Sequence, residues 1–148
     1  MRKLGETLSV LVFVMLISSF VLVSIRYLFN IVPIKFQELV VYLHSIIFML
    51  GIVYAYARNS HVRIDIFYQN MNKEKQRKID LFGTIFLLIP FFGFILFSSY
   101  DYVWSSISKL ESSPDAGGLP FVYALKTLLI IMPVLMILTS LSKLWRRD

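Results

Sequence analysis

The chain has 148 residues, 57% of them hydrophobic, and a mean hydropathy of +0.72. A soluble domain of this size cannot hide that much apolar surface from water, so the composition indicates a membrane protein. The sequence contains no cysteine, which excludes disulfides, thiol catalysis and cysteine-bound metals. The net charge is +6, but the basic residues flank apolar runs, a pattern that suits membrane topology and not nucleic-acid binding.

Four apolar runs follow one another along the chain, and each is long enough to cross a bilayer. A membrane-spanning helix needs roughly 20 apolar residues. The runs predict spans at about 8–29, 36–57, 79–103 and 121–143. None of them alternates with the two-residue period of a strand. We therefore expect an all-α membrane protein, with one four-helix domain that covers residues 1–148.

The positive charges predict how the spans are oriented. With the N-terminus in the cytoplasm, eleven Lys and Arg residues lie inside and four lie outside. Basic residues concentrate on the cytoplasmic side of membrane proteins. We therefore expect both termini in the cytoplasm.

The cytoplasmic connection between the second and third spans, residues 58–78, is polar and basic. Apolar residues alternate with Arg63 and Asp65, which predicts a short extended or interfacial segment. One interpretation is a solvated connector whose basic residues touch anionic phospholipid. A second interpretation is that Asp65 pairs with Arg63, Arg58 or His61 and fixes the segment against a partner.

The third helix is predicted to begin inside the cytoplasm, near Lys73. Asn72 is a suitable N-cap residue, and Glu74 and Lys78 form an i, i+4 pair in the favourable order. Further along, Pro90 in the third span and Pro133 in the fourth each remove a backbone hydrogen bond. We expect both prolines to bend their helices.

The outer connection before the last span reads "KLESSPDAGGLP", residues 109–120. Pro114 favours an extended Ser113, because the proline ring disfavours helical backbone before it. Gly117 and Gly118 permit positive φ, and Pro120 suits the first turn of the last helix. The stretch predicts a shaped turn, whereas a phosphate cradle is poorly supported, since no strand precedes the glycines.

Ionisable residues are scarce inside the predicted spans. Arg26 and Glu38 lie near the outer ends of the first two spans, and we expect them to pair across the outer hairpin or else to reach the interface. Lys126 is expected to extend to the outer interface. His44 is the one ionisable residue well inside a span, and a helix–helix hydrogen bond is its expected role. His61 lies 17 residues further on, about 25 Å by helical rise, so the two histidines cannot hold one haem iron.

The sequence offers no set of nucleophile, base and orienting residue, and no carboxylate pair in one pocket. We therefore expect neither an enzyme, nor a cofactor, nor a metal site. Two rival functions remain to be weighed. A self-sufficient four-helix exporter needs a carboxylate within a span, and the first span has none between Leu8 and Ile25. A membrane anchor of a redox complex would be favoured by two facing histidines on different helices, which the sequence lacks.

Two motifs resemble those of a known family. The stretch "FQELVVYLHSIIFMLGIVYAYARNSHVRIDIFY" is similar to the second helix and following loop of the small membrane subunit, of the DctQ type, of tripartite ATP-independent periplasmic (TRAP) transporters. Glu38 matches an acidic residue that opens that helix, and Ser60 departs from the glycine of many members. The cytoplasmic motif of the family is matched by His61, Val62, Arg63, Ile64 and Asp65.

The outer loop and His44 resemble a branch of that family often labelled mannitol/chloroaromatic. The loop motif is matched by Ser113, Pro114, Asp115, Gly117, Gly118, Leu119 and Pro120. With four spans and both ends inside, the resemblance covers roughly residues 20–140.

The resemblance implies a scaffold subunit in the inner membrane of a bacterium or archaeon. Its partners would be a large multi-span permease subunit, thought to move like an elevator, and a periplasmic substrate-binding protein. The substrate would be an organic acid anion, and sodium would bind the large subunit, so no cofactor is implied here. The motif of His61, Arg63 and Asp65 would lock the cytoplasmic end of the second helix, and the outer loop would lie near the docked binding protein.

Overall fold

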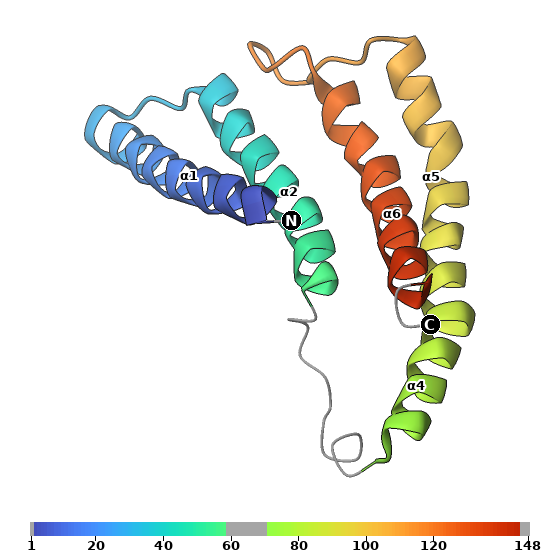
Figure 1. Cartoon of the computed structure of the whole chain (residues 1–148). Helices are drawn as coiled ribbons and strands as arrows, with labels where there is room; N and C mark the ends of the chain where they lie inside the picture. Colours follow the sequence, from blue (N-terminus) through green and yellow to red (C-terminus); the bar gives the residue numbers. More distant parts are fainter. Residues whose placement is uncertain (1, 59–70, 146–148) are drawn as a thin grey trace.

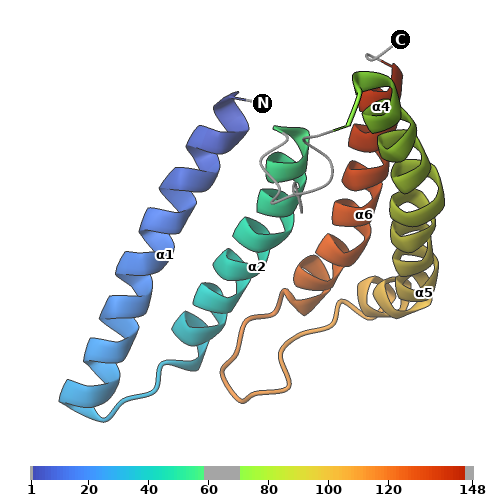
Figure 2. The same cartoon turned by 90° about the horizontal axis from the view of Figure 1, so that it is seen from below.

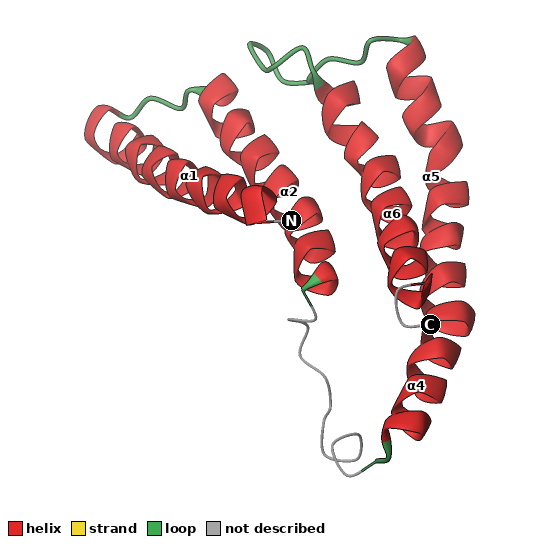
Figure 3. Ribbon diagram, in the orientation of Figure 1, coloured by secondary structure: helices red, strands yellow, loops and turns green. Residues whose placement is uncertain are grey.

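The computed structural model describes residues 2–58 and 71–145, and every regular element in these two stretches is helical (Figure 3). Four helical stretches are long and apolar enough to cross a membrane, one of them built from three consecutive elements. The predicted all-α architecture with four spans is confirmed. The elements are α1 (Arg2–Phe29), α2 (Ile34–Ala57), α4 (Lys73–Phe82), the π-helical η1 (Gly83–Leu88), α5 (Ile89–Ser108) and α6 (Val122–Trp145).

The spans stand side by side in the order α1, α2, α6, α5 (Figures 1 and 2). α2 packs against α1 and α6, and α5 packs against α6. Few apolar side chains are enclosed by this arrangement, and α1 contributes only Leu8 to them. The chain therefore offers wide apolar surfaces to lipid or to another protein, and lipid tails are as apolar as leucine.

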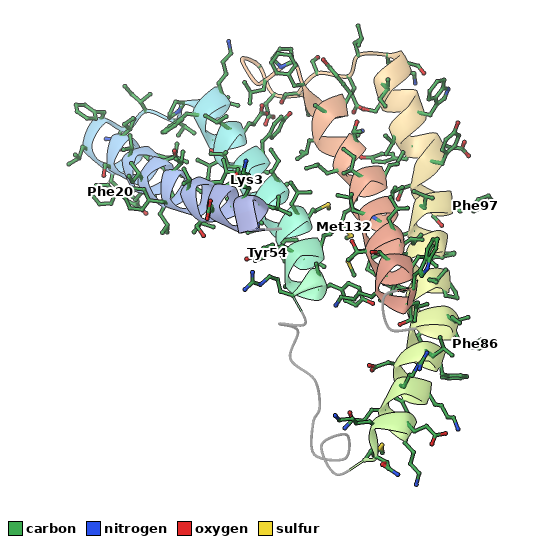
Figure 4. The ribbon with its side chains drawn as sticks, in the orientation of Figure 1. Lys3, Phe20, Tyr54, Phe86, Phe97 and Met132 are labelled. Carbon is green, nitrogen blue, oxygen red and sulfur yellow. The ribbon has the colours of Figure 1, made fainter. Side chains whose placement is uncertain are left out.

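The α1–α2 hairpin is held by a seam of residues with alternating spacings of four and three. These residues of α1 are buried or half-buried, whereas Phe13 and Phe20 are 64% and 73% exposed. Figure 4 shows Phe20 on α1. Alternating spacings of four and three place side chains on one side of a helix, where a second helix can pack. The seam consists of Leu4, Leu8, Leu11, Met15, Ser18 and Leu22.

Close contacts place both ends of the described chain at the same end of the bundle (Figure 2). Gly5 of α1 lies so close to Tyr54 of α2 that a Cβ atom on the glycine would be 2.6 Å from the Tyr54 Cζ. Lys143 of α6 donates a hydrogen bond to the backbone carbonyl of Tyr56 in α2. The assignment of this end to the cytoplasm stays a prediction from the charges.

The third span is longer than a bilayer requires. α4, η1 and α5 form one continuous helical stretch of 36 residues, about 54 Å at 1.5 Å per residue, against a hydrocarbon core of roughly 30 Å, and its first turns in α4 are charged. α4 accordingly extends as an arm beyond the other helices (Figure 1). It begins at Lys73, as predicted, and the Glu74–Lys78 ion pair forms at 2.8 Å. Asn72 occupies the N-cap position, but its side chain makes no capping hydrogen bond.

Pro90 is preceded by a π-helical turn, a feature that we did not predict, and the expected bend at Pro90 stays a prediction. A π-helical turn, η1, runs up to the residue before Ile89, whose backbone N–H donates to Thr84 five residues back. Proline lacks an N–H and its ring crowds the carbonyl four residues earlier, so a wider turn ahead of it relieves both problems. Pro133 lies buried within α6, which continues as one helix on both sides of it.

Candidate functional site: the outer loop and the end of α2

The loop between α5 and α6, which the charges predict to lie outside and which we call the outer loop, is a folded turn with its own hydrogen bonds. The Ser113 N–H donates to the Leu119 carbonyl at 3.0 Å, and the Gly118 N–H donates to the Asp115 carbonyl at 2.9 Å. The Asp115 N–H donates to Ser113 Oγ at 3.1 Å. Gly117 has φ +85°, a conformation that L side chains rarely adopt. The prediction of a shaped turn is confirmed.

Glu38, in the first turns of α2, fastens this loop to the α1–α2 hairpin. Ser113 Oγ donates to one carboxylate oxygen of Glu38. The Leu119 N–H donates to the other at 2.5 Å. Gly118 lies so close that a Cβ atom would be 2.7 Å from Glu38 Oε1. We call these contacts among Glu38, Ser113, Gly118 and Leu119 the Glu38 clasp.

Of the two expectations for Arg26 and Glu38, the pairing across the hairpin is not formed, because Glu38 binds the outer loop. Both carboxylate oxygens of Glu38 accept hydrogen bonds from the loop. Arg26 is exposed in the last turn of α1, and within residues 2–58 and 71–145 it forms no ion pair with Glu38. The physical reason is the smaller loss of side-chain entropy: the loop offers a fixed backbone N–H and a short serine side chain, whereas an exposed arginine gives up much side-chain freedom to form a salt bridge.

A salt bridge and a cation–π contact join the ends of α5 and α6 that flank the loop. Lys126 of α6 donates to the Glu111 carboxylate at 2.6 Å, and its ammonium lies 4.1 Å from the centre of the Tyr102 ring of α5. The Lys126 side chain is 15% exposed, so it is partnered and not simply extended into the interface, as we expected. The hydrogen bond from Lys126 holds the pKa of Glu111 below its ordinary value.

Sequence reasoning did not foresee the roles of Glu111 and Tyr102. A signal for the first was present, because Glu111 in the outer loop and Lys126 near the start of the last span carry opposite charges. Tyr102 is one of several aromatic residues near the outer interface, and the sequence does not distinguish it from the others.

The C-terminal end of α2, which the charges predict to be cytoplasmic, is held by contacts between cations and aromatic rings. The ammonium of Lys143 lies 4.4 Å from the centre of the Tyr56 ring, and the guanidinium of Arg58 lies 5.8 Å from that of Tyr54. The cytoplasmic motif itself, His61, Arg63 and Asp65, lies outside the described residues.

His44 lies on α2 with its side chain exposed. Its ring is stacked on Phe48 of the same helix, with centroids 6.1 Å apart. Within the described parts of the chain, the expected helix–helix hydrogen bond is not formed, and no residue there accepts from or donates to the imidazole. Those parts also hold no group of three or more His, Cys, Asp or Glu residues able to bind a metal ion.

These contacts hold the helices and the loop together. Both carboxylate oxygens of Glu38 are already bound by donors from the chain itself. Such an arrangement fixes the shape of the outer surface. It does not assemble the reacting groups of an active site.

Comparison with known proteins identifies the class of this membrane protein. A family model described as "Tripartite ATP-independent periplasmic transporters, DctQ component" matches residues 9–148. No match was found among curated proteins or among solved structures. Because the family model covers nearly the whole chain, this multi-pass membrane protein belongs to the DctQ family, the small membrane component of tripartite ATP-independent periplasmic transporters.

Proposed function

We propose that this chain is a scaffold for the large, elevator-type permease subunit of a sodium-coupled transporter in the bacterial inner membrane. In this proposal a periplasmic binding protein delivers an organic acid anion, and the large subunit holds the substrate and sodium sites. The chain itself catalyses no reaction and carries no cofactor.

The main support for this proposal is that the contacts of charged residues lie near the helix ends. A carrier needs polar groups along its pathway, deep in the bilayer. The contacts of charged residues described above lie at the helix ends: Glu38 and Lys126 bind residues of the outer loop, and Lys143 at the opposite end binds the Tyr56 carbonyl of α2. Such contacts hold helices together, whereas the wide apolar surfaces remain available for lipid or for a partner subunit.

The outer loop is proposed to shape the surface on which the binding protein docks. Pro114, Asp115 and Gly117 are exposed at its tip, whereas Gly118 and Leu119 are half-buried at the clasp. A loop held at its base can present a defined tip without having to be ordered on binding.

The cytoplasmic motif is proposed to lock the inner end of α2 against α4 or the large subunit. The side chains next to it in sequence, Tyr54 and Tyr56, are already engaged by Arg58 and Lys143. The substitution Asp65→Asn removes the charge and keeps the size. We expect less assembled complex, and normal assembly and uptake in this variant would count against the lock.

Reconstituted transport tests the proposal as a whole. Proteoliposomes would contain the large subunit with or without this chain, and the binding protein loaded with an organic acid anion would be added outside. We expect uptake only when both membrane subunits and an inward sodium gradient are present. Equal uptake without this chain, or transport by this chain alone, would overturn the scaffold role.

A further inference from the structure

One side of α2 carries a line of residues with no neighbouring helix in the described chain. The spacing alternates between four and three, the pattern that aligns side chains along one side of a helix for packing against a second helix. We call this line the His44 stripe, and it consists of Gln37, Val41, His44, Phe48, Gly51 and Ala55.

The stripe is exposed from Gln37 to Phe48 and half-buried at Gly51 and Ala55. Val41 and Phe48 are 49% and 58% exposed, and Gln37 and His44 are also exposed. A Cβ atom added at Gly51 would meet no atom within 4 Å. The helices that pack on α2 therefore leave this side uncovered.

The depth of His44 makes an uncovered stripe unfavourable in lipid. His44 is ten residues from the start of α2 and thirteen from its end, about 15 Å and 20 Å along the axis. A histidine side chain is too short to reach either interface from there. Ionisable residues at such depth face the interior of a helix bundle or a water-filled cavity, and they pair with a polar group.

The other outward surfaces of the chain differ in composition. α1 exposes Phe13 and Phe20, and the α5 edge exposes Phe94 and Phe97, the last at 83%. Figure 4 shows Phe20 and Phe97 on these two helices. Such surfaces suit lipid tails. The His44 stripe instead combines two polar side chains with Gly51 and Ala55, small residues four apart that let a second helix backbone approach closely.

We propose that the His44 stripe is the surface against which a transmembrane helix of the large permease subunit packs. That helix places a hydrogen-bonding side chain or a free backbone carbonyl opposite His44 and lays its backbone over Gly51 and Ala55. The inference rests on the proposed function, which supplies the large subunit as partner, and adds which face of which helix meets it.

The α1–α2 hairpin packs through residues with the same alternating spacing as the His44 stripe. This likeness supports a helix as the partner of the stripe. The α1 seam from Leu4 to Leu22 has alternating steps of four and three and packs on α2. The His44 stripe repeats that spacing from Gln37 to Ala55, with a polar group that lipid cannot satisfy. A second copy of this chain is the competing occupant, and the experiment below distinguishes it.

Site-specific photo-crosslinking tests the stripe in the intact complex. Benzoylphenylalanine would replace Val41 or Phe48, and as matched controls Phe13 of α1 or Phe97 of α5. Each variant would be expressed in the native host in place of the natural chain, and membranes would be irradiated before solubilisation. Tryptic peptides of each adduct would identify the attached protein.

We expect adducts with the large permease subunit from positions 41 and 48 and not from positions 13 and 97. Adducts with that subunit from positions 13 or 97 alone would overturn the proposal that the stripe is the interface, and would leave the proposed function intact. Homodimer adducts from positions 41 and 48 would also overturn it. If no position gave an adduct and the large subunit failed to co-purify, the proposed function itself would fail.

Two substitutions of His44 separate hydrogen bonding from packing. His44→Leu removes the polar group and His44→Gln keeps a donor and an acceptor at similar length. We expect about a 3- to 20-fold weaker association with the large subunit for His44→Leu, the range for one interhelical hydrogen bond, and recovery in His44→Gln. Equal association of both variants with the natural chain would remove His44 from the interface.

Discussion

The substitution Gly118→Ala should open the Glu38 clasp, because the added methyl group has no room. Its Cβ would lie 2.7 Å from Glu38 Oε1 and still closer to Ser113 Cβ and Oγ. The Cβ of Ser113 is attached directly to the backbone and cannot swing aside. Forcing a methyl group into a packed site costs about 1–3 kcal/mol. At about 1.4 kcal/mol per factor of ten, the open form of the loop becomes roughly 5- to 150-fold more populated.

Amide hydrogen exchange measures this opening directly. The Leu119 N–H donates to Glu38 and the Ser113 N–H donates to the Leu119 carbonyl, so both amides exchange when the loop opens. When opening is fast relative to exchange, the exchange rate rises in proportion to the open population. We expect faster exchange at these amides in nanodisc-embedded Gly118→Ala, and unchanged exchange in Gly93→Ala, where a methyl group meets no atom within 4 Å. Equal rates at Leu119 in the natural chain and Gly118→Ala would refute the reasoning.

Three further predictions concern other fastenings. Gly117→Ala should speed amide exchange in the loop, because an L residue at φ +85° costs about 1 kcal/mol or more of backbone strain. Gly117→Asn should speed it less, because asparagine tolerates positive φ better. Glu111 has a lowered pKa, so its pairing with Lys126 contributes stability above the ordinary glutamate pKa of about 4.3, and that contribution is lost as the pH falls through the lowered value. Melting temperatures between pH 7 and pH 3 should therefore fall more for the natural chain than for Lys126→Met, and parallel curves would argue against the pair. Gly5→Leu should lower the melting temperature by displacing the Tyr54 ring, and Tyr54→Ala should restore part of the loss.

The sequence was sufficient for the parts of the fold that depend on local pattern. The four spans follow from the length of each apolar run, and the start of α4 at Lys73 and the Glu74–Lys78 pair follow from spacing along one helix. The positive φ of Gly117 follows from its place in a loop framed by prolines.

The contacts that build the site were beyond sequence reasoning because they join distant segments. Glu38 and Ser113 are 75 residues apart, and nothing in either neighbourhood chooses the loop over Arg26, which lies much closer in sequence. The choice depends on the loop presenting a backbone N–H and a hydroxyl together, which only its folded shape provides. The π-helical turn before Pro90 is likewise one of several ways in which a helix can accommodate a proline.

The central claim is that this chain works as one part of a larger membrane complex, and gentle purification tests it most directly. The tagged chain would be solubilised from native membranes in a mild detergent, and every protein present in stoichiometric amount would be identified. The account predicts one large multi-span permease in equal amount with this chain. A small, stable oligomer of this chain with no permease would contradict the account.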